Sequence, residues 1–306
     1  MVVDYKMKKQ INYVQNILKE ICEEKNIEFN LVSENWIAIL KKGDKVRSIS
    51  GYKFCLNNHS SGIICDDKYA LYDTLKLLNI PVAEHKIIFR NYNKEEIIEF
   101  FKNNNNDVVI KSNNGSCGSN IYHITNVEEL FKYVDNLLID NFSISLCPFY
   151  KIKNEYRTII LNDNIELFYG KKRPIVYGDG KKSIKQLLCE FNYNYFSKIE
   201  DEKLNIILEK DKEYMYNWQH NLSKGAIPFE EIDERLKNRI QTLAKKTFNA
   251  LDLRFASVDI IELESGEILI LEINSGVMIE NYAQIVKNGE EICKNIYSKA
   301  IDSMFE

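Results

Sequence analysis

The sequence predicts an α+β protein, and three observations lead to this prediction. Apolar residues at helical spacing occur in residues 8–25, 66–79 and 231–251. Short apolar runs bounded by turn residues separate these segments and predict strands. Two such runs flank Ser265 and Gly266, a pair typical of turns, and predict an antiparallel hairpin over residues 258–274.

The first 65 residues predict a small α/β part. Its helix, residues 8–25, has an apolar stripe formed by Ile11, Val14, Ile17, Leu18 and Ile21. Strands are expected at residues 29–32 and 36–40, followed by a turn at Gly43 and Asp44. No motif in this part indicates chemistry.

From residue 66 onward, helices and strands are expected to form one larger domain, residues 66–306. Asp66 or Asp67 can cap the helix that begins there, and Pro81 ends it. The strands that follow are expected at residues 84–89, 108–111, 142–146, 157–162 and 165–170. Helices are expected at residues 94–101, 127–135, 183–191 and 231–251, before the hairpin.

Composition excludes several classes of function. The chain has 306 residues, 45% hydrophobic and 28% charged, with a net charge of -4, so it predicts a globular protein without nucleic-acid or membrane partners. The seven cysteines are scattered and form no CxxC pair, which argues against disulfides and a zinc site. With no signal peptide and no membrane span, a cytoplasmic location is expected. A homo-oligomer remains compatible with the sequence.

The hairpin carries the most informative pattern. Side chains alternate along a strand, so Glu272 and Asn274 share one face, and Asp259 on the partner strand can meet them. Two carboxylates and an amide oxygen form an all-oxygen site that suits Mg²⁺ or Mn²⁺. The alternative is a solvated strand face, but the surrounding residues are strongly apolar.

A second pattern predicts phosphate binding. Lys111 ends a buried strand, and residues 112–120 form a loop rich in Gly, Ser and Asn, whose backbone N–H groups suit a polyphosphate. The order of residues is not that of a P-loop. The alternatives are an ordinary turn and, for Lys68 and Lys111, solvated lysines.

Three further segments can contribute to a binding site. The segment 149–157 can hold an adenine edge with its backbone, while Glu155 suits ribose hydroxyls and Arg157 suits a phosphate or a carboxylate. Residues 171–173 are basic, and residues 217–225 form a polar loop. The alternative for Glu155 and Arg157 is a surface ion pair, and for residues 171–173 it is a solvated face. For His220 it is a structural or surface role. No cysteine has a histidine spaced to make it a nucleophile.

In this order, the pieces resemble the ATP-grasp superfamily over Asp66 to about Tyr282. The stretches 177–184 and 221–225 are most similar to the ATP-grasp modules of cyanophycin synthetase and of bifunctional glutathione synthetase. The spacing of Asp259, Glu272 and Asn274 is similar to that of D-alanine–D-alanine ligases. The resemblance implies an ATP-grasp fold with an N-terminal part, a lid over about residues 84–147 and a C-terminal subdomain over about residues 148–306.

The resemblance also implies an ATP site. Lys68 and Lys111 contact the α- and β-phosphates, the backbone of Tyr150 and Lys151 binds adenine, and Glu155 binds ribose. The flap that covers the phosphates includes Gly115, Ser116, Gly118 and Ser119. Pro148 stands where these enzymes commonly have a hinge acid, so the adenine amino group must be recognised by backbone groups.

The remaining implied roles concern metal binding and catalysis. Arg157, with Lys171 or Arg173, faces the γ-phosphate or the acyl group, and Asn221 contacts phosphate or the second substrate. The Mg²⁺ ligands are Asp259, Glu272 and Asn274.

The implied enzyme is a carboxylate–amine ligase that works through an acyl phosphate. Its substrates would be an amino acid or peptide carboxylate and an amine acceptor. Two alternatives stay open. One is a phosphotransferase on the same fold without an amine acceptor, and the other is a non-catalytic nucleotide-binding module.

Overall fold

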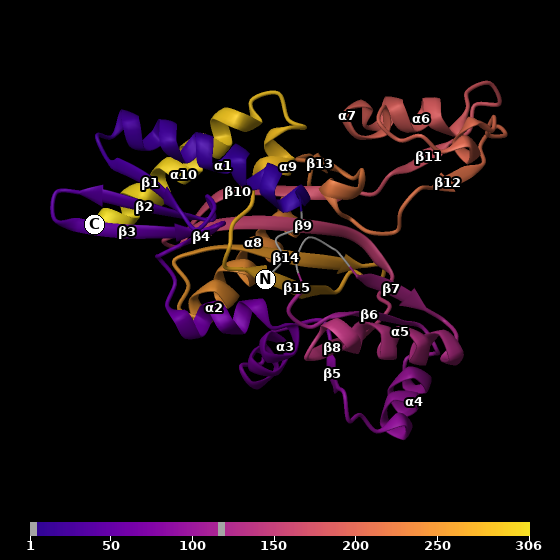
Figure 1. Cartoon of the computed structure of the whole chain (residues 1–306). Coiled ribbons are helices and arrows are strands. Elements are labelled where there is room, and N and C mark those ends of the chain that lie inside the picture. Colours follow the sequence, from indigo (N-terminus) through magenta and orange to yellow (C-terminus); the bar gives the residue numbers. More distant parts are fainter. Residues whose placement is uncertain (1–4, 116–119) are drawn as a thin grey trace. The chain divides into compact units, whose positions relative to one another are not determined.

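The computed structural model describes residues 5–115 and 120–306 (Figure 1). These residues form two compact units, each built from several stretches of the chain. Unit 1 comprises Met1–Leu56, Asn164–Glu234 and Gly276–Glu306, and unit 2 comprises Asn57–Asp163 and Arg235–Ser275. Among the described residues, no helix combines the length and the apolar composition that crossing a membrane requires.

Unit 1 contains an N-terminal antiparallel sheet and helices from both ends of the sequence. The sheet has the order β1-β2-β3-β4, with β1 Glu28–Val32, β2 Ile37–Lys42, β3 Lys45–Ser50 and β4 Lys53–Phe54. The helices are α1 Tyr5–Glu24, α9 Glu280–Ala283 and α10 Gly289–Phe305. The ring of Phe54 stacks on that of Tyr297 in α10, with 5.5 Å between centroids. The sheet is therefore packed against residues from the opposite end of the chain.

The rest of unit 1 includes a small cluster of short elements. β10 Asn164–Lys172 pairs antiparallel with β13 Ile227–Phe229, and β11 Ile175–Tyr177 pairs antiparallel with β12 Glu213–Met215. The helices are α6 Ile184–Phe191, α7 Tyr193–Phe196, η1 Glu202–Asn205 and η2 Leu222–Lys224. Their apolar side chains form a core of their own that includes Leu188, Phe196 and Leu204.

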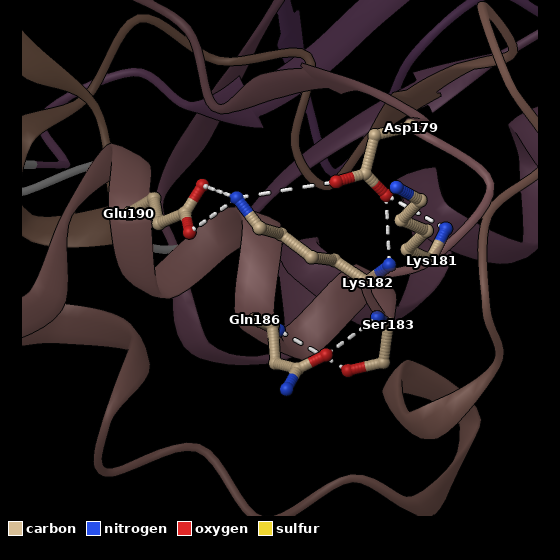
Figure 2. Close-up of polar contacts among 6 residues, drawn as sticks. All are labelled: Asp179, Lys181, Lys182, Ser183, Gln186 and Glu190. Atoms are coloured by element: carbon tan, nitrogen blue, oxygen red, sulfur yellow. Dashed lines mark hydrogen bonds and ion pairs between the residues drawn. The ribbon is translucent and has the colours of Figure 1, made fainter.

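The residues just before α6, 178–183, form a turn that is held by side-chain and backbone hydrogen bonds (Figure 2). Asp179 Oδ1 accepts hydrogen bonds from the backbone N–H groups of Lys181, at 2.8 Å, and Lys182, at 2.7 Å. Ser183 and Gln186 then form a capping box at the helix N-terminus. Gly178 is required by space, because a Cβ atom there would lie 1.9 Å from the carbonyl oxygen of Glu209. This stretch therefore builds a turn and a helix start.

Unit 2 contains a four-stranded antiparallel sheet with two helices packed on it. The sheet has the order β5-β8-β6-β7, with β5 Lys86–Phe89, β8 Ser143–Pro148, β6 Val108–Ser112 and β7 Ile121–Ile124. The helices are α4 Lys94–Asn103 and α5 Val127–Asp140, whose apolar faces share a core with Val108 and Ile110. Because side chains alternate along a strand, Lys111 lies on the opposite face of the sheet from this core.

The other strands of unit 2 confirm the predicted hairpin. β14 Phe255–Leu263 pairs antiparallel with β15 Ile268–Asn274, and also with β9 Ile152–Leu161 on its other side. The ladder between β14 and β15 shifts register between Asp259 and Ile260. The helices of this part are α2 His59–Asp66, α3 Lys68–Leu77 and α8 Glu234–Ala250. As predicted, an Asp caps α3, because Asp67 Oδ1 accepts from the N–H of Ala70 at 2.8 Å.

The sequence analysis missed several elements. Strands β3, β4 and β7 and helices α2 and α10 were not predicted, and the polar segment up to residue 216 contains β11, β12, α7 and η1. The predicted limits of the lid and of the C-terminal subdomain stay predictions.

Candidate active site

The predicted metal ligands come together on β14 and β15 of unit 2. Asp259 lies directly opposite Glu272 in the antiparallel ladder, and Asn274 lies two residues further along β15. Directly opposed residues point to the same face of a sheet. The amide nitrogen of Asn274 donates a hydrogen bond to Glu272 Oε1 at 3.2 Å, so the amide oxygen of Asn274 is the atom left for a metal ion.

Arg157 on β9 completes this group. Arg157 lies opposite Asp259 in the ladder between β9 and β14. Its Nε donates to Asp259 Oδ1 at 2.7 Å and its Nη2 donates to Asp259 Oδ2 at 2.6 Å. Glu155 lies two residues before Arg157, on the same face of the strand, and is buried. Residues predicted separately for ribose, phosphate and metal therefore share one face of the β9-β14-β15 sheet.

The donor set fits a hard divalent cation. The atoms offered are carboxylate oxygens of Asp259 and Glu272 and the amide oxygen of Asn274, which are typical ligands of Mg²⁺ and Mn²⁺. In the part of the chain that the structure describes, no three residues among His, Cys, Asp and Glu gather as a metal site. A site built on this hairpin therefore depends on the amide of Asn274 as well as on the two carboxylates.

Two buried lysines lie at the start of the predicted flap. Lys111 is 6% exposed on β6, and Lys68 is 9% exposed at the start of α3. Lys68 Nζ donates to the backbone carbonyls of Asn113, at 3.2 Å, and Gly115, at 2.7 Å. The Asn113 side chain accepts from the N–H of Tyr69 at 3.1 Å. The N-terminus of α3 is thus joined to the loop that follows β6.

The charges near these lysines explain a displaced pKa. The pKa of Lys68 is lowered to about 8, mainly because the side chain is buried; the positive charge of Lys111 acts in the same direction, and the negative charges of Glu272, Asp67 and Asp66 oppose the change. Lys68, Lys111 and Glu272 are therefore close enough to influence one another. Two buried cations close to one another form a favourable site for phosphate oxygens.

The flap itself is described only in part. Ser116, Gly118 and Ser119 lie outside the residues that the structure describes, and Gly115 is the last described residue before them. The proposed roles of these flap residues stay predictions.

The predicted adenine-binding residues Tyr150 and Lys151 lie directly before β9. The hydroxyl of Tyr150 accepts from the N–H of Glu84 at 2.9 Å. The carbonyl of Lys151 accepts from the N–H of Glu264 at 3.0 Å, so this carbonyl already takes part in the fold. An adenine ring would have to use the other backbone groups of the segment.

The remaining predicted residues belong to unit 1. Lys171 is buried on β10, and its carbonyl accepts from Nδ1 of His220 at 2.6 Å. Burial lowers the pKa of His220 to about 4, so this histidine is neutral near pH 7 and holds the loop to β10. Asn221 Oδ1 accepts from the N–H and from the hydroxyl of Ser223, both at 2.9 Å. Arg173 lies just beyond the end of β10 and is partly exposed.

His85 lies near Lys68 and Lys111, and it was not predicted as a residue of the site. Its Nδ1 lies 2.7 Å from the hydroxyl oxygen of Ser145, which pairs with Lys111 in the ladder between β6 and β8. Burial, together with the charges of Lys111 and Lys68, holds the pKa of His85 well below its ordinary value. A single histidine within the strand predicted at residues 84–89 gives no signal of this position.

Comparisons with known proteins agree with this architecture. No model of a protein family matches the chain. The sequence is 23% identical over 291 residues to the glutathione biosynthesis bifunctional protein GshAB of Clostridium perfringens, covering 85% of this chain and 36% of the relative. The chain thus spans about a third of the length of this curated relative.

Two solved structures carry the comparison of folds. The crystal structure of a bifunctional glutathione synthetase from Pasteurella multocida superimposes with a TM-score of 0.56 at 17% identity, covering 93% of this chain and 43% of that one. The D-alanine–D-alanine ligase from Bacillus anthracis gives a TM-score of 0.56 at 16% identity, covering 83% of this chain and 70% of that one. These are ATP-grasp structures, and together with the strand order and the hairpin described above they show that the chain has the ATP-grasp fold.

Proposed function

We propose that the chain is an ATP- and Mg²⁺-dependent ligase that joins a carboxylate to an amine. The observation that carries the proposal is the face of the β9-β14-β15 sheet on which Asp259, Glu272, Asn274 and Arg157 lie together. The names of the relatives support it, because they refer to glutathione biosynthesis and to D-alanine–D-alanine ligation.

In this proposal the described residues of unit 2 bind the nucleotide. Asp259, Glu272 and Asn274 hold Mg²⁺, with Mn²⁺ as a substitute. The bound ion supplies charge neutralisation for the phosphoryl group that is transferred. Lys68 and Lys111 hold the α- and β-phosphates, for which their burial and positive charge are suited.

The proposed nucleoside contacts come from the two residues before β9 and from β9 itself. Backbone groups of Tyr150 and Lys151 bind adenine, and Glu155 binds the ribose hydroxyls. The flap, with Gly115, Ser116, Gly118 and Ser119, closes over the phosphates.

The proposed reaction has two steps. A carboxylate oxygen attacks the γ-phosphorus of ATP, the bond from this phosphorus to the β–γ bridging oxygen breaks, and ADP leaves an acyl phosphate behind. The amine nitrogen then attacks the acyl carbon, loses a proton, and expels inorganic phosphate as the amide forms. Arg157, with Lys171 or Arg173, stabilises the negative charge on the transferred group. Closure over the acyl phosphate would keep water out, since water would hydrolyse it.

The substrates we propose are an amino acid or peptide as the carboxylate and an amine as the acceptor. Asn221 contacts phosphate or the second substrate. Its Oδ1 caps η2, so its amide nitrogen is the group to be used.

The test is a screen of amino acids and short peptides, singly and in pairs, for stimulated phosphate release from ATP and Mg²⁺. Mass spectrometry then identifies the product. We expect ADP, inorganic phosphate and an amide in equal amounts, and a hydroxamate when hydroxylamine replaces the amine.

The outcomes separate the candidate functions. A phosphorylated product without inorganic phosphate would identify a phosphotransferase, and nucleotide binding without any turnover would identify a binding module. Glu272→Gln should abolish the reaction. Glu264→Gln, on the exposed turn of the same hairpin, is the matched control and should leave it unchanged.

A further inference from the structure

Both oxygens of a proposed metal ligand are already held by a guanidinium group. Arg157 binds Asp259 in a bidentate manner, with distances of 2.7 Å to Oδ1 and 2.6 Å to Oδ2. The side chain of Asp259 is 2% exposed and that of Arg157 is 16% exposed. The pair is therefore shielded from water, where charge-assisted hydrogen bonds are strong.

The guanidinium has an evident electrostatic role. A buried carboxylate without a counter-charge is strongly unfavourable, and Arg157 supplies that counter-charge. Glu272 lies opposite Asp259 on the other side, so the same face carries a second carboxylate. A divalent cation that binds Asp259 would share an oxygen with the guanidinium, and it would place two positive charges beside a third.

We propose that Arg157 competes with the divalent cation for Asp259. When the cation binds, the guanidinium releases at least one carboxylate oxygen and becomes available to an anionic group of the substrate. This inference rests on the metal ligands of the proposed function. It adds that the affinity for the cation is limited by an ion pair inside the chain, and that binding of the cation and freeing of Arg157 are one event.

A second ion pair on the same two strands provides a control. Lys153 Nζ lies 2.9 Å from Oε1 of Glu262. Oε2 of Glu262 accepts from Asn154, at 3.0 Å, and from the hydroxyl of Tyr156, at 2.8 Å. Glu262 lies an odd number of residues from Asp259, on the opposite face of β14, so it has no part in the proposed metal site.

The experiment measures Mn²⁺ binding at pH 8 without nucleotide, from the paramagnetic resonance signal of free Mn²⁺, with Mg²⁺ as competitor. An opposite charge at hydrogen-bond distance changes the affinity of a carboxylate for a proton by about tenfold or more. We expect a similar change for Mn²⁺, so Arg157→Gln should bind Mn²⁺ about tenfold or more tightly than the wild type. Arg157→Lys, which keeps the charge but loses the bidentate contact, should fall between them, and Lys153→Gln should not change the affinity.

Equal or weaker binding by Arg157→Gln would overturn the inference, as would an equal gain in Lys153→Gln. If Arg157→Gln does not fold, the test uses Arg157→Lys instead. A Mn²⁺ affinity of Arg157→Lys equal to that of the wild type would then contradict the competition. Failure of the proposed function looks different. In that case the wild type binds no Mn²⁺ even with ADP, or Glu272→Gln binds it as well as the wild type does.

Discussion

Glu280 offers a sharp test of how burial controls stability in unit 1. The residue begins α9 and is 0% exposed. The hydroxyl oxygen of Tyr297 lies 3.2 Å from Glu280 Oε1 and 2.9 Å from the carbonyl oxygen of Val277. One hydroxyl proton cannot serve two acceptors, so both contacts are satisfied when the Glu280 carboxyl keeps its own proton.

The magnitude follows from the pKa. Burial raises the pKa of Glu280 from 4.5 to about 8. Below pH 4.5 the carboxyl is protonated in both the folded and the unfolded chain, so its burial does not lower the free energy of unfolding through ionisation. Between pH 4.5 and about 8 only the unfolded chain ionises, and the free energy of unfolding falls by about 1.4 kcal/mol per pH unit. Over the whole window the loss is on the order of 5 kcal/mol.

Glu280→Gln removes the proton equilibrium while keeping the shape and a donor toward Tyr297. We expect its free energy of unfolding in urea to lose this pH dependence, so that its advantage over the wild type grows from pH 5 to pH 8. Glu290→Gln, on an exposed position of α10, is the control and should parallel the wild type. Parallel curves for Glu280→Gln and the wild type would show that Glu280 is ionised in the folded protein, and the argument from burial would fail.

Three further outcomes can be measured. Lys111→Ala should weaken ATP binding in calorimetry by about tenfold or more, because a charge-assisted hydrogen bond to phosphate is lost; unchanged affinity would contradict a role for this lysine. Glu272→Gln should lower turnover with Mg²⁺ by orders of magnitude with little loss of stability, and near-normal turnover would remove the metal assignment. Gly178→Ala should destabilise the fold by about 1–3 kcal/mol in urea unfolding, since its Cβ would overlap the carbonyl of Glu209, and a neutral result would show that the turn adapts.

Local patterns predicted much of this fold. The turn at Ser265 and Gly266 and the alternation of side chains were enough to place Asp259 beside Glu272, because a hairpin pairs residues close in sequence. Strand β7, Ile121–Ile124, was missed because four residues give too short a pattern and depend on pairing with β6. Strand β3, Lys45–Ser50, was missed because its apolar residues, Val46 and Ile49, do not alternate as the side chains of a half-buried strand do.

The site could be predicted only as separate parts. The contact between Arg157 and Asp259 depends on the register between β9 and β14, two strands that are distant in sequence. A slip of one residue would turn Arg157 to the other face, and nothing in either strand alone fixes that register. The position of His85 beside Ser145 likewise depends on a pairing of distant strands.

The division of the chain between the units has a consequence for folding. The sheet β1–β4 is synthesised before α10, which packs on it and is the last of the described elements in chain order. Contacts such as that of Lys25 with Asp302, 2.8 Å long, join residues 277 positions apart. Such contacts are formed only after a large loss of chain entropy, which slows folding. Unit 1 therefore cannot finish folding on the ribosome before residues 289–305 emerge, and until then its first sheet exposes apolar surface that chaperones can bind.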